Sequence, residues 1–263
     1  MVDFQIAEFY NIQDLRKIMA LLRAPGGCPW DMAQTHQSIR ANMLEEAYEA
    51  AGAIDCMDMD NLKEELGDVL LQVVFHACMA QEAGYFTFDD VVDGICKKLI
   101  YRHPHVFGTV EARDPEGALS AWDAQKRAEK GQKTAADALD SVARALPGLT
   151  RASKLQSKAA KAGFDWEEVS PALDKLSEEL EELKTAIREG SNVEEELGDL
   201  LFAAVKVGRF VQVDGEQALQ GACEKFIRRF RRVEQLAEGP MDGLGLPALE
   251  ALWRQAKEEE KRA

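Results

Sequence analysis

Two stretches of the chain have acidic side chains at a spacing that suits a metal site. Glu46 and Glu49 are three residues apart, and so are Glu65 and Asp68. Residues three apart on a helix share one face, so each pair would project its carboxylates to the same side. The arrangement recurs later in the chain, at Glu179, Glu182, Glu196 and Asp199. Four clustered carboxylates repel one another, and a hard divalent cation such as Mg²⁺ would stabilise them.

The distance between the pairs predicts that each set comes together in a helical hairpin. Residues that face each other in an antiparallel hairpin have numbers with a constant sum. If Glu46 faces Asp68, the first hairpin is centred on residue 57, inside a predicted turn over 55–61. The second set is centred on residue 189, next to the turn residues Gly190-Ser191-Asn192. The sequence therefore predicts two carboxylate clusters of the same design.

The chemistry expected of such a cluster is hydrolysis of a phosphorylated small molecule. Mg²⁺ keeps coordination positions open for phosphate oxygens, and Mn²⁺ is a possible substitute. Two such ions could polarise a phosphate and activate a bound water. A neighbouring carboxylate, Glu45 in the first copy or Glu178 in the second, could orient or deprotonate that water.

An acidic run is more often a solvated helix face, and two features argue against that interpretation here. Strongly apolar runs follow Asp68 and Asp199, which predicts that both acids lie at the edge of a core. Gly67 and Gly198 recur just before them, although Gly costs about 1 kcal/mol relative to Ala inside a helix. Close helix approach, or room for a ligand, would explain both glycines.

The elements expected to position these residues are helices throughout. Apolar residues recur at threes and fours, and no segment shows sustained alternation with hairpin turn chemistry. The expected helices cover residues 8–23, 38–54, 62–83, 88–100, 119–129, 149–162, 170–188, 193–211, 216–237 and 247–261. The predicted fold class is all-α.

The two halves of the chain resemble each other, with an offset near 130 residues. Tryptophan-containing turns, acidic helices and an E-E-L-G-D segment recur in the same order, which indicates an internal duplication. We therefore expect an N-terminal repeat over 1–110, a connector with a short helix over 111–145, and a C-terminal repeat over 146–263.

Composition narrows the possible partners. The net charge of −15 disfavours a nucleic-acid polymer, since such binding depends on Lys and Arg that neutralise phosphates. The five scattered cysteines fit a reducing cytoplasm better than a disulfide framework. Neither a signal sequence nor an apolar run of spanning length is evident. We expect a soluble cytoplasmic protein that does not bind membranes.

The chain resembles the MazG family of nucleoside triphosphate pyrophosphohydrolases in its two-repeat form, over nearly its whole length. The matching segments are Gly27–Asp31, Leu44–Glu49, Glu65–Leu71, Arg102–Gly108, Leu146-Pro147, Gly163–Trp166, Glu178–Glu182, Glu196–Leu200 and Lys225–Phe230. The resemblance implies tandem helical repeats, a helical bundle completed by homodimerisation, and Mg²⁺-dependent cleavage of an NTP or dNTP to monophosphate and pyrophosphate. Control of the nucleotide pool, or house-cleaning of damaged nucleotides, would be the purpose.

The resemblance also implies roles for individual residues. It assigns Glu179, Glu182, Glu196 and Asp199 as metal ligands of the C-terminal repeat, which is generally the hydrolytic one, and Glu46, Glu49, Glu65 and Asp68 as those of the N-terminal repeat. The expected nucleotide-binding residues are Lys175, Lys225, Arg228 and Arg229, with Trp253 stacking on the base. One position departs from the family: Cys223 stands where Asn is frequent, and a thiol is a poor substitute for an amide that bonds phosphate.

Some of these residues also have simpler interpretations. The cationic stretch around Arg228 and Arg229 could be a surface salt-bridge network. Trp30 and Trp166 are expected to anchor the core rather than stack on a base. His103 and His105 flank a proline, which favours a structural turn over a metal pair.

Two other functions compete with this interpretation. A carboxylate di-iron bundle is disfavoured, because it needs Glu-x-x-His twice and this motif is absent. A non-catalytic helical module that binds nucleotides or a partner is the second alternative, above all for the N-terminal repeat.

Overall fold

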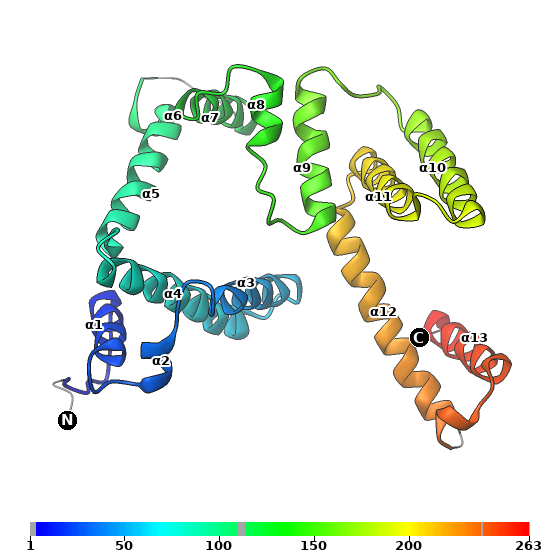
Figure 1. The fold of residues 1–263 in the computed structure, drawn as a ribbon, viewed down its shortest axis with the longest axis horizontal. Helices are drawn as coiled ribbons and strands as arrows, with labels where there is room; N and C mark the ends of the chain where they lie inside the picture. The colour runs from blue at the N-terminus through cyan, green and yellow to red at the C-terminus, as the bar shows by residue number, and fades with distance from the viewer. Residues whose placement is uncertain (1–3, 110–113, 238, 263) are drawn as a thin grey trace. The chain divides into compact units, whose positions relative to one another are not determined.

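The computed structural model describes residues 4–109, 114–237 and 239–262, and in these residues every regular element is a helix (Figure 1). The first helices are α1 (Ile12–Arg23), α2 (Pro29–Ala33), α3 (Arg40–Asp55), α4 (Met59–Glu82), α5 (Phe88–Arg102), α6 (Pro104–Phe107) and α7 (Pro115–Glu129). They are followed by α8 (Ala135–Asp140), α9 (Gly148–Lys161), α10 (Ser170–Glu189), α11 (Val193–Phe210), α12 (Gly215–Leu236), the 3₁₀ turn η1 (Met241–Gly243) and α13 (Leu246–Arg262). The predicted all-α class is confirmed.

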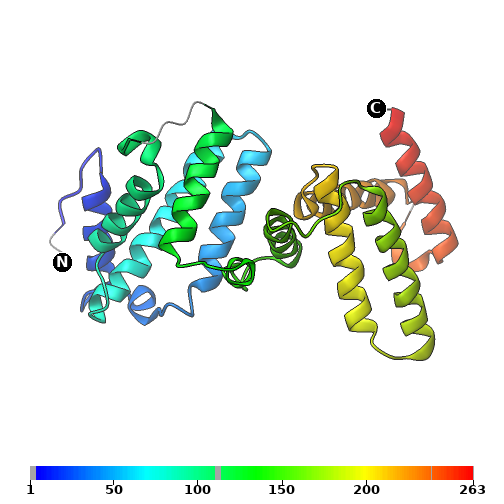
Figure 2. The same cartoon turned by 90° about the horizontal axis from the view of Figure 1, so that it is seen from above.

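The chain divides into two compact units, Met1–Lys126 and Arg127–Ala263. Each unit contains one long antiparallel hairpin, formed by α3 with α4 in the first and by α10 with α11 in the second (Figure 2). In the described part of the chain, none of the helices combines the length and the apolar composition that a bilayer crossing requires.

Both hairpins turn where the carboxylate spacing predicts. Met57, the predicted centre of the first turn, has a φ of 55°, and helix α4 begins two residues later. In the second hairpin Gly190 ends α10 in the left-handed conformation with a φ of 68°. Gly adopts this conformation without a Cβ penalty, so the residue type fixes the turn.

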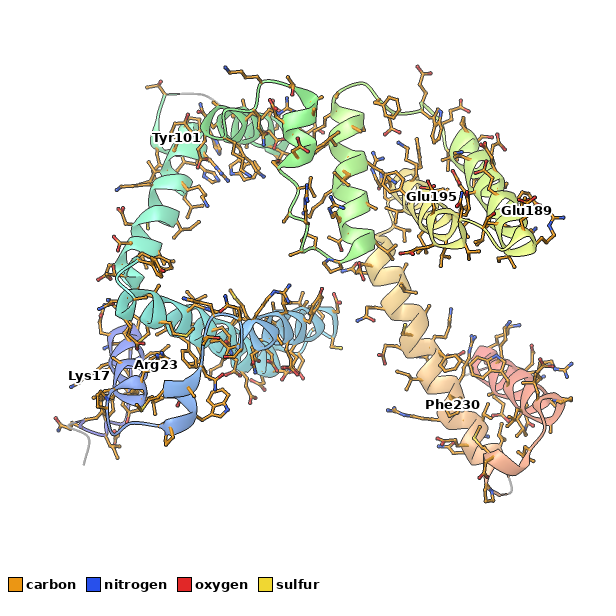
Figure 3. All side chains as sticks on the ribbon, in the orientation of Figure 1. Lys17, Arg23, Tyr101, Glu189, Glu195 and Phe230 are labelled. Carbon is orange, nitrogen blue, oxygen red and sulfur yellow. The ribbon has the colours of Figure 1, made fainter. Side chains whose placement is uncertain are left out.

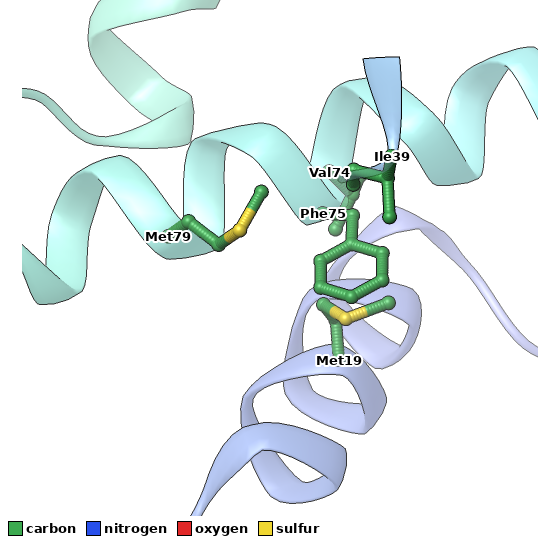
Figure 4. Close-up of a cluster of buried hydrophobic side chains, with 5 residues drawn as sticks. All are labelled: Met19, Ile39, Val74, Phe75 and Met79. Atoms are coloured by element: carbon green, nitrogen blue, oxygen red, sulfur yellow. The ribbon is translucent and has the colours of Figure 1, made fainter. Parts of the chain in front are cut away.

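The core of the first unit lies between α1 and α4. Met19, Ile39, Val74, Phe75 and Met79 form a buried apolar cluster there (Figure 4). Phe75 and Met79 are one helical turn apart on α4, so that helix presents one apolar face to α1. The carboxylates of α4 lie on the turns that precede this face.

The short helices α2, α6 and α8 were not predicted from the sequence, because four to six residues are too few to show an amphipathic pattern. Proline at the first helical position opens α2 and α6, where its missing N–H costs no hydrogen bond. A capping box between Thr134 and Asp137 opens α8. His103 caps the end of α5, so the expected turn at the His-Pro-His segment takes the form of a short helix.

The expectation that two tryptophans anchor the core is wrong. Trp30 is 58% exposed and Trp166 is 43% exposed. Trp30 lies on the five-residue helix α2, and Trp166 lies in the link between α9 and α10, so neither is on a core-facing stripe of a long helix. Of the two explanations offered for Gly67 and Gly198, close helix approach is wrong, since a Cβ built on either would meet no atom of another element within 4 Å.

Candidate metal centre and active site

Three carboxylates meet on the hairpin of the second unit. One ligand oxygen from each of Glu179, Glu196 and Asp199 can be chosen so that all three lie within 4.8 Å of one another. Glu179 is 6% exposed, whereas Glu196 is half-buried and Asp199 is exposed. Glu189 is the last residue of α10 and Glu195 lies in the first turn of α11, so both lie near the turn of this hairpin (Figure 3). The cluster is therefore packed against the protein at Glu179 and accessible to solvent at Asp199.

Glu182, the fourth predicted ligand, lies next to this group. A hydrogen bond to the Glu179 carboxyl, followed by partial desolvation and the charge of Glu179, raises the pKa of Glu182. Two carboxyl groups that hydrogen-bond each other must share a proton, so the ion-free cluster resists full ionisation. A divalent cation would remove this requirement.

Lys175 supplies the nearest positive charge to the cluster. Its Nζ lies 2.8 Å from an oxygen of Glu179 and 2.8 Å from an oxygen of Glu178. These two hydrogen bonds raise the pKa of Lys175 above its ordinary value. Lys175 therefore stays protonated at neutral pH, beside the predicted general base.

The first unit repeats the cluster in part. Ligand oxygens of Glu46, Glu49 and Glu65 lie within 4.8 Å of one another. Partial burial, followed by the charge of Asp68, raises the pKa of Glu46. Partial burial and the charge of Glu49 do the same for Glu65. Asp68 therefore lies close enough for its charge to act on Glu46 and Glu65, although it is not one of the three clustered residues. Glu182 has the corresponding place in the second unit.

Both clusters fit a hard cation. Their donors are carboxylate oxygens, which Mg²⁺ and Mn²⁺ prefer, and no His or Cys of the described chain joins them. Desolvation raises the pKa values of Glu46 and Glu65 and a hydrogen bond raises that of Glu182, and the charges of neighbouring carboxylates add to each shift, as expected for acids that lie close together without an ion.

A cleft of about 590 Å³ adjoins the second cluster, and Glu179 and Asp199 form part of its wall. Most of its remaining surface is apolar, with Phe164, Trp166 and Phe202 among the lining residues. Clefts of this size and character bind drug-sized ligands in many proteins. The arrangement offers a metal site at one side and an apolar recess at the other.

Lys206, which sequence reasoning missed, gives this cleft a second cation. It forms an ion pair with Asp165, and its Nζ lies 5.3 Å from the centre of the Trp166 ring. Burial acts to raise the pKa of Asp165, but hydrogen bonds from Lys206 and Arg209 outweigh it and lower that pKa. A signal was present in the sequence, because Lys206 follows Asp199 by seven residues, two turns along the same face.

Comparison with known proteins identifies the family to which this chain belongs. The MazG nucleotide pyrophosphohydrolase domain matches residues 34–107 and again residues 161–233, so each match contains one hairpin. The chain belongs to the MazG family. The predicted duplication is thereby confirmed, and so is the enzyme class of nucleotide pyrophosphohydrolase.

Relatives with curated names extend the MazG match over nearly the full length. A nucleoside triphosphate pyrophosphohydrolase of Escherichia coli strain K12 is 46% identical, across 95% of this chain and 98% of the relative. The nucleoside triphosphate pyrophosphohydrolase/pyrophosphatase MazG of Thermotoga maritima is 43% identical, across 93% of this chain and 95% of its own. The Bacillus subtilis protein YabN is 46% identical, across 97% of this chain and 53% of YabN.

The two MazG repeats differ in the cations around their carboxylates. Lys175 precedes Glu179 by four residues, and Asn42 occupies that position before Glu46. Lys206 has its counterpart in Phe75, seven residues after Asp68. Phe75 is 4% exposed and belongs to the apolar core. The first repeat therefore keeps the carboxylates and lacks both cations.

The predicted nucleotide-binding residues of the last two helices lie elsewhere in the MazG fold. Arg228 and Arg229 on α12 both pair with Glu260 of α13, the second at 2.6 Å. Trp253 packs on Phe226, with ring centres 5.2 Å apart. The described residues that line the cleft include none of these, nor Lys225, whose side chain is exposed. Arg228, Arg229 and Arg232 of α12 thus form a salt-bridge network with Glu259 and Glu260 of α13, as the simpler interpretation expected for this stretch.

Proposed function

We propose that this chain hydrolyses nucleoside triphosphates to nucleoside monophosphate and pyrophosphate, with Mg²⁺ held by Glu179, Glu182, Glu196 and Asp199. The observation that supports it most strongly is the joint placement of the carboxylate cluster, two lysines and an apolar cleft in one unit. Metal and lysines suit a triphosphate, and the apolar recess suits a base. The names of the E. coli and T. maritima relatives describe a pyrophosphohydrolase of nucleoside triphosphates as well.

The metal ion, the two lysines and Glu178 have separate roles in the proposed reaction. When bound, a divalent cation neutralises phosphate charge and acidifies a coordinated water. Lys175 and Lys206 offset the negative charge of the triphosphate, and Lys175 also holds the Glu178 carboxylate in place at 2.8 Å. Glu178 is 57% exposed, so water reaches it, and it accepts the proton of the attacking water.

The N-terminal repeat binds a metal ion without turnover under this proposal. Glu46, Glu49, Glu65 and Asp68 provide the ligands, and Asn42 and Phe75 replace the cations that would hold phosphates. A non-catalytic role is therefore assigned to this repeat alone. Lys225, Arg228, Arg229 and Trp253 would contribute to triphosphate binding only if α12 and α13 face the cluster of a second copy.

Product analysis tests the reaction. We expect the purified protein with Mg²⁺ to convert ATP to AMP and pyrophosphate in equal amounts, without ADP or inorganic phosphate. Chromatography of the nucleotides and ³¹P NMR of the phosphates distinguish these outcomes. Formation of ADP and phosphate would contradict the proposal, and bound but uncleaved nucleotide would favour the non-catalytic module. A panel of NTPs and dNTPs in the same assay measures base and sugar preference.

A homodimer is supported by the outer face of the second hairpin. Leu173, Leu180 and Ile187 are seven residues apart on α10, and all three are exposed. Leu197 and Leu201 are exposed one turn apart on α11. Apolar residues at heptad spacing on two neighbouring helices are typical of a helical-bundle interface. A second copy, related by a two-fold axis, would cover this face with the same face of its own.

Charge on that face should separate the copies. We expect the protein to elute at twice its chain mass of 29.2 kDa, and the double variant Leu180→Asp, Leu201→Asp to elute at the chain mass. Burying two unpaired carboxylates in an apolar interface costs several kcal/mol, more than a modest dimer can offset. Light scattering after size-exclusion chromatography gives both masses. The control Leu246→Asp changes an exposed leucine of α13 and should leave the dimer intact; a monomeric unmodified protein would refute the interface.

Nucleotide-pool control or house-cleaning in the cytoplasm is the cellular role we propose. Nucleoside triphosphates are made and used there, and the net charge of −15 disfavours nucleic-acid polymers as competing ligands.

A further inference from the structure

A triad of charged side chains lies at the aromatic side of the cleft. Asp165, in the link between α9 and α10, forms ion pairs with Lys206 and Arg209 of α11. Asp165 and Lys206 both line the cleft. The side chains are 21% exposed for Asp165, 13% for Lys206 and 18% for Arg209. Ion pairs with so little exposure are screened less by solvent than surface pairs, so the triad holds its members in place.

Asp165 determines where the ammonium group of Lys206 lies. Its Oδ1 contacts the Lys206 Nζ and also accepts a hydrogen bond from the backbone N–H of Trp166, at 3.0 Å. Its Oδ2 accepts a hydrogen bond from Arg209, also at 3.0 Å. The Lys206 Nζ lies 5.3 Å from the centre of the Trp166 ring, within the range of a cation–π contact. One carboxylate therefore fixes the cation and the aromatic ring side by side.

The triad leaves one positive charge in the cleft. Its two cations and one carboxylate give a net charge of +1, whereas the whole chain has −15. Lys206 follows Asp199 by seven residues, which is roughly 10 Å along α11 by the rise per residue of a helix. A nucleotide with its phosphates at the carboxylate cluster and its base beside Trp166 would extend past this cation.

The first repeat folds the same kind of hairpin without this triad. At the offset that relates the two E-E-L-G-D segments, Phe75 and Cys78 replace the two cations. Pro29 precedes Trp30, whereas in the second repeat the carboxylate of the triad precedes the tryptophan. A hairpin of this design therefore does not need the triad in order to fold. Its presence in the second repeat alone indicates a role toward a ligand.

We propose that Asp165 is a positioning residue for substrate binding, because it holds the ammonium group of Lys206 against Trp166 where a nucleotide crosses the cleft. This inference rests on the proposed hydrolysis of nucleoside triphosphates. A lysine side chain has many rotamers, and fixing one of them before the substrate binds removes part of the entropic cost of binding. Asp165 acts through Lys206 and does not contact the phosphates itself, since two anions repel each other.

The sign of a change in KM tests this role. Asp165→Asn keeps the shape of the side chain, but its single amide oxygen can accept from Lys206 or from Arg209 and not from both. We expect KM for ATP to rise about tenfold, the size of one charge-assisted hydrogen bond, while kcat stays within about threefold. A carboxylate that acted through its charge alone would repel the triphosphate, so its removal would lower KM.

A double-mutant cycle shows whether Asp165 acts through Lys206. Lys206→Met should raise KM about as much as Asp165→Asn does, and the double variant should differ from Lys206→Met by less than about twofold. A link that was merely disordered by the substitution would add its own loss, and the two effects would multiply. Asp89→Asn is the matched control, because Asp89 pairs with Arg16 at 2.8 Å in the other unit, and it should leave KM unchanged.

Three results would overturn the inference: an unchanged or lower KM in Asp165→Asn, multiplied losses in the double variant, or an equal rise in Asp89→Asn. If Asp165→Asn does not fold, the ammonium signal of Lys206 in ¹H–¹⁵N NMR spectra of the unmodified protein provides the test. Held ammonium protons exchange slowly enough to be seen, so we expect a signal that is lost in Lys206→Met and that shifts when AMP is added. Absence of the signal, or of the shift, would be the contrary result.

Failure of the proposed function is distinguishable from failure of this inference. If the unmodified protein releases no pyrophosphate from any nucleotide, the proposed function fails. Calorimetric titration with ATP and Mg²⁺ then still tests Asp165, with about tenfold weaker binding in Asp165→Asn as the expected result. Equal affinities of the two proteins, or no binding by either, would overturn the inference.

Discussion

Glu179→Ala should reduce pyrophosphate release from ATP by roughly 100-fold or more, the scale seen when a group that stabilises transition-state charge is removed. Glu179 is the most buried acid of the cluster, at 6% exposure, and it also holds Lys175 at 2.8 Å. Its loss removes a proposed metal ligand and releases Lys175, the cation beside the proposed general base Glu178. Initial rates at saturating Mg²⁺ and ATP give the effect on kcat.

The duplicated design of the chain supplies the matched control. Glu46 holds the equivalent position in the first hairpin, and Glu46→Ala should leave kcat within about twofold, because Asn42 and Phe75 already replace the phosphate-binding cations there. Thermal unfolding and chain mass should be alike for both variants. Wild-type rates in Glu179→Ala, or a loss in Glu46→Ala as large as that in Glu179→Ala, would contradict the assignment of turnover to the second repeat.

Removal of divalent metal should abolish pyrophosphate release altogether, and added Mg²⁺ should restore it. The clusters are the physical reason, because each holds at least three carboxylates at one point, and the ion pair of Lys175 with Glu179 offsets only part of this charge in the second unit. Dialysis against EDTA, followed by titration with Mg²⁺ and then with Mn²⁺, measures the dependence. Iron-dependent colour or oxidase activity would instead support the di-iron bundle, and full activity after EDTA treatment would refute the metal assignment.

Metal removal should also change how stability depends on pH. The pKa values of Glu46, Glu65 and Glu182 are raised above the ordinary value of 4.5, so the folded protein binds protons there more tightly than the unfolded chain does. Their contribution to stability is present at low pH and is lost as the pH rises through the raised values. As the pH falls from 7 toward 5, these three acids should therefore add stability to the metal-free protein, and Mg²⁺ should remove their contribution. His76, whose pKa is lowered below 6.5 by burial and by the charge of His36, acts in the opposite direction, so the quantity to compare is the difference between the metal-free and the Mg²⁺-loaded protein.

Melting temperatures across that pH range, with EDTA and with Mg²⁺, provide the measurement. Acids with lowered pKa values, such as Asp165 and Glu82, act in the opposite direction, but only near and below their ordinary values of 3.8 and 4.5. The double variant Glu65→Gln, Glu182→Gln should weaken this contribution in the metal-free protein. An identical pH profile in that variant would show that the clusters do not cause it.

The sequence by itself determined the hairpins and most of their chemistry. Glu46 and Glu49 share a face because helical geometry is local, and the midpoint between Glu46 and Asp68 placed the turn at Met57, where φ is 55°. All ten expected helices have counterparts in the described chain, and each begins and ends within four residues of its predicted bounds. Residues within one helix, or across one turn, obey spacing rules that need no tertiary information.

The tertiary structure alone decided what surrounds the second cluster. Gln156, Trp166 and Lys206 come from α9, from the link after it, and from α11, and only the packing of α9 on α11 brings them into one cleft. No spacing rule connects residues on helices that are not neighbours in sequence. Packing likewise exposed Trp166 beside Lys206, although its large apolar ring favoured a core position. The carboxylates followed from local periodicity, and the cleft that would select their substrate followed from packing between helices.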